Sequence, residues 1–250
     1  MSENKTTGNL EAGLHLLGLP FMAQNHSLLA AKAARDGIGI LDYLDGLVHG
    51  ELNQRRDRAT ARRVKNARFP VIKTMDQFSW CWPKKINKMA IQNLFRLQFL
   101  EDRANVLLLG TVGLGKTHIA TSLGYAACLA GKSVLFTTAV DTINTLATAQ
   151  AANKLKAELK KYLAPSLLIL DELGYLPIDK HGADLLFQVI SQRYERGSII
   201  ITSNRAFKQW AEIFNNDSTL TSAILDRLLH HAETQVIEGR SYRMKDHLDS

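Results

Sequence analysis

The sequence predicts an α/β fold with a five-stranded parallel sheet, preceded by a small all-α region. From Asn105 onward, short apolar segments alternate with longer segments whose apolar residues recur at helical spacing. Short apolar strands between helices are typical of a parallel sheet that is covered on both faces. Before about residue 75 only helical spacing is found, for example at Leu41, Leu44 and Val48. The 250 residues are enough for one large core and a smaller appended unit.

Three helices are expected in the N-terminal region. Leu10, Leu14 and Leu17 share one face of the first, which ends at the Gly-Leu-Pro sequence of residues 18–20. A second helix is expected at 22–35, and a third from about residue 38 to the break at Pro70. The predicted domains are a helical domain at 1–75, a connector at 76–104 and an α/β domain at 105–250.

The elements of the α/β domain follow from the alternation of apolar runs and helical periodicity. Strands are expected at 106–109, 133–137, 167–170, 199–202 and 234–237. Helices are expected at 116–130, 140–150, 155–163, 182–195 and 219–231.

A phosphate-binding loop of the form G-x-x-x-x-G-K-[ST] follows the first of these strands. Its glycines allow positive φ angles, so that successive backbone N–H groups can point at phosphate oxygens. Lys116 is expected to reach the β- and γ-phosphates of ATP and the Thr117 hydroxyl to bind Mg²⁺, while the next helix offers its positive N-terminus. The residues expected to contact the nucleotide are Gly110, Thr111, Val112, Gly113, Leu114, Gly115, Lys116, Thr117 and His118.

The apolar strand at 167–170 ends in two acids, Asp171 and Glu172. Ligand sites of α/β proteins lie at the carboxyl edge of the parallel sheet. We expect Asp171 to hold Mg²⁺, directly or through water, and Glu172 to polarise the attacking water as general base. Two acids after a strand can also simply begin a turn, and it is the preceding phosphate loop that favours the catalytic interpretation.

Two further polar residues are candidates for catalysis. Asn204 follows the strand at 199–202 and can contact the γ-phosphate or position the water, although Ser203 and Asn204 can also begin a turn. Arg227 lies beside Asp226 in an otherwise apolar helix. It fits an arginine finger that one subunit supplies to its neighbour's γ-phosphate, and equally a charge pair on a helix surface.

Histidines and cysteines show no metal-binding pattern. Cys81 and Cys128 are not in C-x-x-C spacing. His118, His230 and His231 have no partners at ligand spacing, and the adjacent His230 and His231 are expected to face different directions on a helix. Neither a zinc site nor a disulfide framework is therefore expected.

Positive charge is concentrated in one stretch of the chain. Residues 53–96 contain twelve Lys or Arg and two acids, a net charge of +10, whereas the whole chain carries +7. Such a local excess is typical of nucleic-acid binding. Arginine dominates its helical part, and guanidinium groups bind phosphate bidentately, although charge runs are also found on solvated surfaces. The expected DNA-binding residues are Arg55, Arg56, Arg58, Arg62, Arg63, Lys65 and Arg68.

The expected partner is duplex DNA, with little sequence preference, because phosphate contacts carry no sequence information. No apolar run approaches the roughly 20 residues of a membrane span, and the first residues lack the pattern of a secretory signal. A cytoplasmic protein without a membrane partner is therefore expected.

Several segments together resemble one known family. They are GTVGLGKTH at 110–118, LLILDELGYLP at 167–177, IIITSN at 199–204, ILDRLLHHA at 224–232 and the closing GRSYR at 239–243. These segments resemble the IstB-like family of transposition helper ATPases, which are related to the DnaC-type helicase loaders in the AAA+ initiator branch.

The resemblance implies an AAA+ P-loop NTPase core with DNA-stimulated ATP hydrolysis. It implies that Asn204 is the sensor, that Arg227 is the arginine finger acting in trans, and that 141–163 match the extra helix of this branch. The sequence continues for only about a dozen residues after the last strand, so no C-terminal helical lid is expected. Arg243 could stand in for the second sensor that such a lid carries.

For function, the resemblance implies an ATP-dependent homo-oligomer on duplex DNA that guides or stimulates an insertion-sequence transposase. A replicative helicase loader of the DnaC type is the alternative, because both would use the same catalytic residues. A small-molecule kinase would have no use for Glu172, Asn204 and Arg227 together. A scaffold that binds ATP without hydrolysing it would not need both Asp171 and Glu172.

Overall fold

The computed structural model describes residues 3–244, which divide into two compact units. The division falls between Arg62 and Arg63, within the long helix α3 (Ile40–Ala67). This is earlier than the boundary near residue 75 that the sequence suggested. The reason is packing, because Ala67, Ile91 and Phe99, on either side of the expected boundary, are buried in the core of the second unit. The residues expected to form a connector therefore belong to that core.

The first unit contains α1 (Glu3–Leu16), α2 (Pro20–Asp36) and most of α3. Its most specific contact joins α2 to α3. The buried Glu51 carboxylate accepts hydrogen bonds from the backbone N–H groups of Phe21 and Met22, at 2.8 and 3.2 Å. These N–H groups lie in the first turn of α2, where no intrahelical acceptor is available to them. The side chain of Glu51 thus fixes the start of one helix from the middle of another.

The second unit is built on a parallel sheet with strand order β2-β3-β4-β1-β5. Its strands are β1 (Asn105–Leu109), β2 (Val134–Thr138), β3 (Leu167–Leu173), β4 (Ser198–Ser203) and β5 (Ala232–Val236). Its helices are α4 (Lys88–Leu94), α5 (Gln98–Glu101), α6 (Lys116–Leu129), α7 (Ala139–Ala151), α8 (Leu155–Leu163), α9 (Lys180–Arg193), α10 (Trp210–Ile213) and α11 (Ser218–Leu229). The single turns of 3₁₀-helix are η1 (Met75–Gln77), η2 (Phe207–Gln209) and η3 (Tyr242–Met244).

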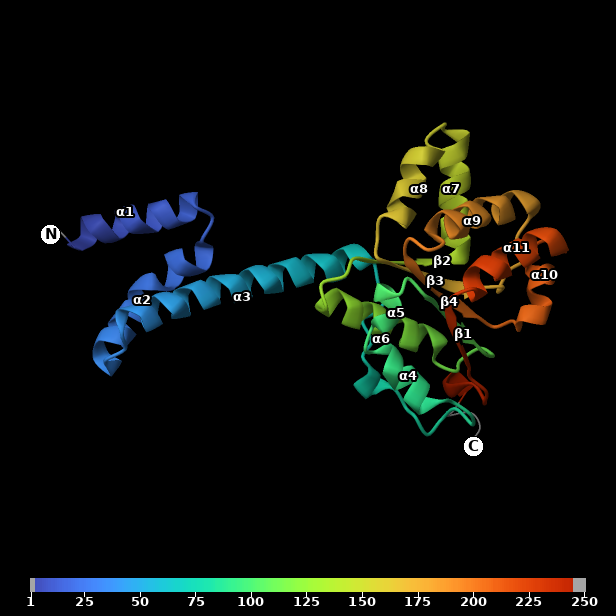
Figure 1. Cartoon of the computed structure of the whole chain (residues 1–250), viewed down its shortest axis with the longest axis horizontal. Helices are drawn as coiled ribbons and strands as arrows, with labels where there is room; N and C mark the ends of the chain where they lie inside the picture. Colours follow the sequence, from blue (N-terminus) through green and yellow to red (C-terminus); the bar gives the residue numbers. More distant parts are fainter. Residues whose placement is uncertain (1–2, 245–250) are drawn as a thin grey trace. The chain divides into compact units, whose positions relative to one another are not determined.

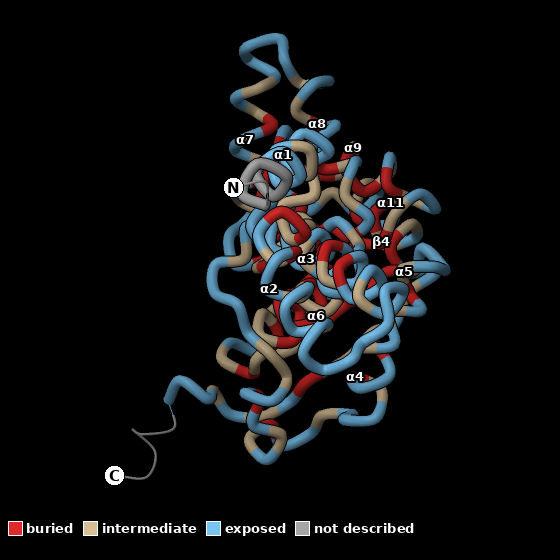
Figure 2. The backbone as a smooth tube through the Cα atoms, turned by 90° about the vertical axis from the view of Figure 1, so that its left-hand side faces the viewer, coloured by how far each residue is buried: buried red, intermediate tan, exposed pale blue. Residues whose placement is uncertain are grey.

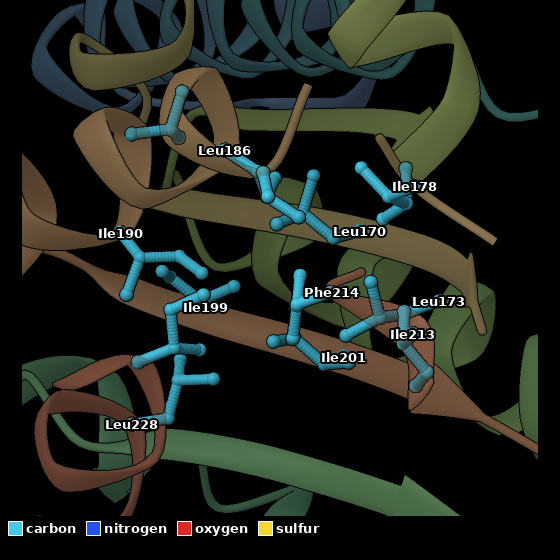
Figure 3. Packing of buried hydrophobic residues seen from close by; sticks show 14 of the residues in the cluster. Leu170, Leu173, Ile178, Leu186, Ile190, Ile199, Ile201, Ile213, Phe214 and Leu228 are labelled. Atoms are coloured by element: carbon cyan, nitrogen blue, oxygen red, sulfur yellow. The ribbon is translucent and has the colours of Figure 1, made fainter. Parts of the chain in front are cut away.

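Helices cover both faces of this sheet (Figure 1). Successive strand residues point to opposite faces, so Leu107 and Leu109 belong to one core cluster, and Val106 and Leu108 to the other. Helices α7 to α11 pack on the first face, part of which is drawn in Figure 3, and α4, α5 and α6 pack on the second. The outer end of the α7–α8 hairpin is exposed (Figure 2).

The strands and helices predicted after residue 105 are all found, with small shifts at their ends. The short α10, with η2 before it, was not predicted, because its two turns are too short to show a helical period. No helix within residues 3–244 combines the length and the hydropathy that crossing a membrane requires.

Candidate nucleotide site

The phosphate loop joins β1 to α6 at the carboxyl edge of the sheet. Two of its glycines are required by close neighbours as well as by the backbone. Gly113 has φ 79°, and a Cβ there would lie 2.0 Å from Ser241 Oγ. Gly115 has φ 85°, and a Cβ there would lie 2.6 Å from Phe78 Cε2. Side chains at either position would both strain and displace the loop.

Lys116 is the first residue of α6 and is only 4% exposed. Its Nζ donates hydrogen bonds to the carbonyl oxygens of Gly110 and Thr111, at 2.7 and 2.8 Å. Burial lowers the pKa of Lys116 to about 8, and Arg243 acts in the same direction, whereas Asp171 and Glu172 oppose the shift. An ammonium that is buried and held by neutral carbonyls gains stability from an anion, as phosphate would supply.

Asp171 receives hydrogen bonds from two hydroxyl groups. Thr117 Oγ1 lies 2.9 and 3.0 Å from its two carboxylate oxygens, and Thr202 Oγ1 donates to Oδ1. The three side chains come from α6, β3 and β4, which meet at this edge of the sheet. Thr202 was not among the residues predicted from the sequence. In the sequence, the only indication of a role for Thr202 was its hydroxyl group at the end of an apolar strand.

Glu172 reaches the same edge because β3 is irregular. Adjacent strand residues normally point to opposite faces, but the pairing of β3 with β4 shifts register between Leu170 and Leu173. Glu172 has φ 62°, and its backbone N–H donates to Thr202 Oγ1 at 3.0 Å. Glu172 lines the cavity in front of the phosphate loop. One bulge thus brings two consecutive acids to one site.

Asn204 follows β4, the strand between β1 and β3. The end of β4 is fixed to the phosphate loop, because the N–H of Gly110 donates to Ser203 O at 3.2 Å. Within the described residues, Asn204 Oδ1 is buried and has no hydrogen-bond partner. Buried polar atoms are normally paired, so this oxygen is suited to accept a hydrogen bond from a group that enters the site, such as water.

A cavity of about 580 Å³ opens in front of the loop. Its floor contains the phosphate-loop residues from Gly113 onward, including Lys116, Thr117 and His118. Gly110, Thr111 and Val112 are not part of this lining, and Val112 is 42% exposed. The ring of His118 is held by a hydrogen bond between its Nε2 and Thr74 O, at 2.7 Å. The lining residues outside the phosphate loop, other than Glu172, are Pro70, Val71, Lys73, Gln77, Phe78, Ser79, Trp82, Pro83, Thr121, Tyr175, Tyr242 and Arg243.

Most of these lining residues outside the loop were not predicted, because they come mainly from two segments that are far apart in the sequence, 70–83 and 242–243. The C-terminal strap, residues 237–243, crosses the loop. The N–H of Tyr242 donates to Gly113 O, and Trp82 Nε1 donates to Arg240 O, both at 2.9 Å. Lys85 and Glu238 exchange two backbone hydrogen bonds of 3.0 Å. The sequence shows Trp82 only as an aromatic residue in the expected connector. Its position at the cavity depends on the fold, which brings it next to Arg240.

Arg227 lies far from this cavity in its own chain. It is in the last turn of α11, whose end leads into β5, and Ala232 at the start of β5 pairs with Asn105 at the start of β1. The phosphate loop follows the other end of β1, so roughly 15 Å of strand separates the two places. Arg227 Nη1 donates to Ala223 O at 2.8 Å, and its guanidinium lies 5.0 Å from the Phe187 ring. Arg227 therefore cannot reach the nucleotide cavity of its own chain without a large movement.

The seven basic residues proposed for DNA binding lie on α3 and directly after it, and the structure separates them into two groups. Arg55 is paired with Glu51 at 3.3 Å and donates to Gly18 O, while Arg63 is half-buried and donates to Cys128 O at 3.0 Å. The exposed members whose side chains form no hydrogen bond or ion pair among residues 3–244 are Arg56, Arg58, Arg62, Lys65 and Arg68. These five are free to meet a phosphate.

The residues at the carboxyl edge fit ATP with Mg²⁺. Asp171, Thr117 and Thr202 provide oxygen atoms, which are the ligands that Mg²⁺ prefers. Lys116 supplies a buried positive charge, and the glycine backbone leaves space that a Cβ would fill. When bound there, Mg²⁺ would neutralise phosphate charge. Glu172 lines the cavity and could accept a proton from water there, whereas Asn204 is not among the lining residues.

The chain is similar to known ATP-binding proteins over almost its whole length. The family model described as IstB-like ATP binding protein matches residues 12–250. The protein named as the putative ATP-binding protein of insertion sequence IS21, from Pseudomonas aeruginosa, is 40% identical over 237 residues, which cover 95% of this chain and 89% of that one. The corresponding protein of IS5376, from Geobacillus stearothermophilus, is 39% identical over 232 residues, covering 93% and 92%.

Solved structures agree on the fold of the second unit. The crystal structure of the DnaC helicase loader covers 70% of this chain and 99% of that chain, with a TM-score of 0.55 and 23% identity. AMPPCP-bound DnaA from Aquifex aeolicus covers 72% and 54%, with a TM-score of 0.58 and 19% identity. The fold is therefore that of the AAA+ P-loop ATPases. Since the family model and the insertion-sequence relatives both span nearly the whole chain, the protein belongs to the IstB-like ATP-binding family.

Proposed function

We propose that this protein is an ATP-hydrolysing helper of insertion-sequence transposition, which assembles on duplex target DNA with ATP and recruits or stimulates the transposase. The observation that carries the proposal is the site at the carboxyl edge. There Lys116, Thr117 and Glu172 line one cavity, and the buried Asp171 accepts hydrogen bonds from the hydroxyl groups of Thr117 and Thr202 beside it. The insertion-sequence relatives, alike over almost their full length, support the biological setting.

We assign ATP hydrolysis to Glu172 and Asn204. We assign its acceleration in an assembly to Arg227 of a neighbouring subunit. Glu172 lines the cavity, which supports the role of general base. Asn204 is not among the lining residues, and the role of holding the water rests on its buried Oδ1, which has no partner among the described residues. Arg227 is half-exposed at the amino edge of the sheet, where a neighbouring molecule could be reached. An arginine finger supplied in trans raises hydrolysis by about 10³–10⁵. The site would then be complete only in an assembly, which couples turnover to oligomerisation.

DNA binding is assigned to the free arginines of α3. Arg56, Arg58 and Arg62 are exposed, and none of them forms an ion pair within the described residues. Each chain alone would hold few phosphates, so its affinity would be modest. Neighbours joined through ATP would add their contacts along one duplex and bind more tightly. A replicative helicase loader remains the second candidate, supported by the likeness of fold to DnaC.

The proposal is tested by DNA binding at several duplex lengths. Fluorescence anisotropy of the full chain with ATP should show affinity that rises with duplex length, and with ADP this dependence should be lost. Lys116→Ala is the control, because it should bind alike with either nucleotide. Affinity that is independent of length with ATP would contradict assembly along DNA. Binding of the assembled protein to the transposase of its own insertion sequence, and not to the replicative helicase, would separate helper from loader.

A further inference from the structure

Two adjacent histidines and a glutamate meet on the surface, at the amino edge of the sheet. Glu195 follows α9, and His230 and His231 follow α11. One ligand atom from each of the three lies within 4.8 Å of the others. The sequence suggested that His230 and His231 face different directions and have no partner. That expectation was wrong, because the end of α11 brings their ring centroids to 4.1 Å, and the segment after α9 supplies the third residue.

Neighbouring groups hold these side chains and their backbone in place. Tyr194 OH lies 2.9 Å from His230 Nδ1, which leaves Nε2 of that ring available. Arg103 Nη1 donates to Glu195 O at 2.8 Å, and His231 O accepts the N–H of Asn105 at 2.7 Å. Histidines that bind metals usually have their second ring nitrogen fixed by such a partner, which sets the orientation of the ring. The cluster therefore has supporting contacts as well as donor atoms.

We propose that Glu195, His230 and His231 form a binding site for a transition-metal ion of the Zn²⁺ type. Two imidazole nitrogens and one carboxylate suit Zn²⁺ and similar ions, whereas Mg²⁺ prefers oxygen ligands alone. Zn²⁺ ligands lie at about 2.0–2.2 Å from the metal, so tetrahedral donors are about 3.5 Å apart. The three side chains are exposed, so rotation about their side-chain bonds is not blocked by burial and could bring together donor atoms that now lie within 4.8 Å of one another.

The charged side chains near the cluster affect which fourth ligand the metal ion would take. Arg103 and Arg227 line the same hollow as Glu195 and His231. Both are cations, so they favour an anionic fourth ligand, such as chloride or hydroxide, in the position that three protein donors leave open. The site is separate from the nucleotide cavity of its own chain. It adjoins Arg227, so metal binding is tested without nucleotide, where the function proposed above plays no part.

The test is metal binding by the untagged, chelator-treated full chain without nucleotide. Calorimetry with Zn²⁺ should give one ion per chain at this site, and Co²⁺ should give a visible absorption band that Zn²⁺ removes. A large excess of Mg²⁺ should not compete. His230→Ala and His231→Ala should each weaken binding at least about tenfold. His181→Ala, which removes an exposed histidine of α9 elsewhere, is the matched control and should bind as the wild type does.

Glu195→Gln keeps the size and shape of the side chain, so it separates the loss of a metal ligand from misfolding. It should lower the affinity, while the thermal unfolding midpoint without metal stays unchanged. Equal affinity in the wild type and in the His230→Ala, His231→Ala double variant would overturn the proposal. Displacement of Zn²⁺ by Mg²⁺ would overturn it too, because it would place the ion at the nucleotide site.

Discussion

The two units of the chain use their polar and apolar residues in opposite ways. In the sheet unit, the functional polar groups are bonded to one another at the edge of a buried core, as Thr117, Asp171 and Thr202 show. In the helical unit, large apolar side chains are exposed, with Leu16 at 90% and Ile40 at 84%. Its part of α3 also carries exposed arginines without partners among the described residues.

The two units therefore differ in what stabilises them and in the surface that they expose to partners. A sheet that is covered on both faces needs nothing outside itself to fix the phosphate loop. A helical unit that exposes apolar and basic side chains has surface to offer to other molecules. Single substitutions in the sheet unit should therefore have large effects on nucleotide binding and hydrolysis. Substitutions in the helical unit should each have a small effect on DNA binding, and these effects should add.

The largest effect is expected for Lys116→Ala. The change removes the buried ammonium that would neutralise the β- and γ-phosphates, and it leaves the carbonyls of Gly110 and Thr111 without their donor. Nucleotide binding should become undetectable by calorimetry at concentrations that saturate the wild type. ATP affinity within a few-fold of the wild type would show that the loop is not the phosphate site.

Glu172→Gln should leave binding intact and slow hydrolysis. The amide keeps the size of the side chain and cannot accept the proton, and loss of a general base costs typically about 10²–10⁴-fold in rate. Phosphate release under saturating ATP measures this. The variant should also stay on DNA longer, because its nucleotide persists. A wild-type turnover rate would remove Glu172 from the mechanism.

Nucleotide affinity should depend on pH through Lys116. Its pKa in the free protein is lowered to about 8, mainly by burial, and bound phosphate favours the charged form. Below pH 8 the lysine already carries its proton, so affinity is flat. Above pH 8 binding must take up a proton, and affinity should fall by up to about tenfold per pH unit. Calorimetry in buffers of different ionisation enthalpy detects that uptake at about pH 8.5, and its absence there would show that Lys116 stays charged in the free protein.

The smallest effects are expected on α3. Replacing Arg56, Arg58 and Arg62 with Ala should flatten the dependence of log affinity on log salt by up to roughly three units, about 0.9 for each phosphate that is no longer neutralised. A matched control replaces three exposed cations of the sheet unit, Lys180, Arg196 and Lys208, and should leave the slope unchanged. Equal slopes in both triple variants would make the arginines of α3 ordinary solvated surface.

The sequence predicted the sheet and the phosphate loop well because local signals determine them. Four apolar residues before a glycine loop allow few alternatives to a buried strand, and Lys116 and Thr117 follow from the motif. Thr202, Trp82 and Tyr242 could not be predicted in the same way. They come to the site only through strand order and through the C-terminal strap, which pairs segments more than 150 residues apart.

The metal cluster was missed for a related reason. His230 and His231 gave no spacing signal, since their partner Glu195 lies at the end of a different helix. Arg227 shows that predicting the helix of a residue does not establish its role. Its helix was predicted, but whether it acts in its own site or in a neighbour's depends on geometry that no local pattern encodes. The length of β1 separates Arg227 from the phosphate loop of its own chain, and its action in a neighbour's site is our proposal.

The most direct test of a site shared between subunits is a mixing experiment. Lys116→Ala lacks a working pocket but keeps its arginine, and Arg227→Ala keeps its pocket but lacks the arginine. Each alone should be inactive in ATP hydrolysis with DNA, and a mixture should recover activity that peaks near equal amounts. A mixture of Arg227→Ala with the Lys116→Ala, Arg227→Ala double variant should stay inactive. If mixed assemblies form and no activity returns at any ratio, catalysis across the subunit boundary is contradicted.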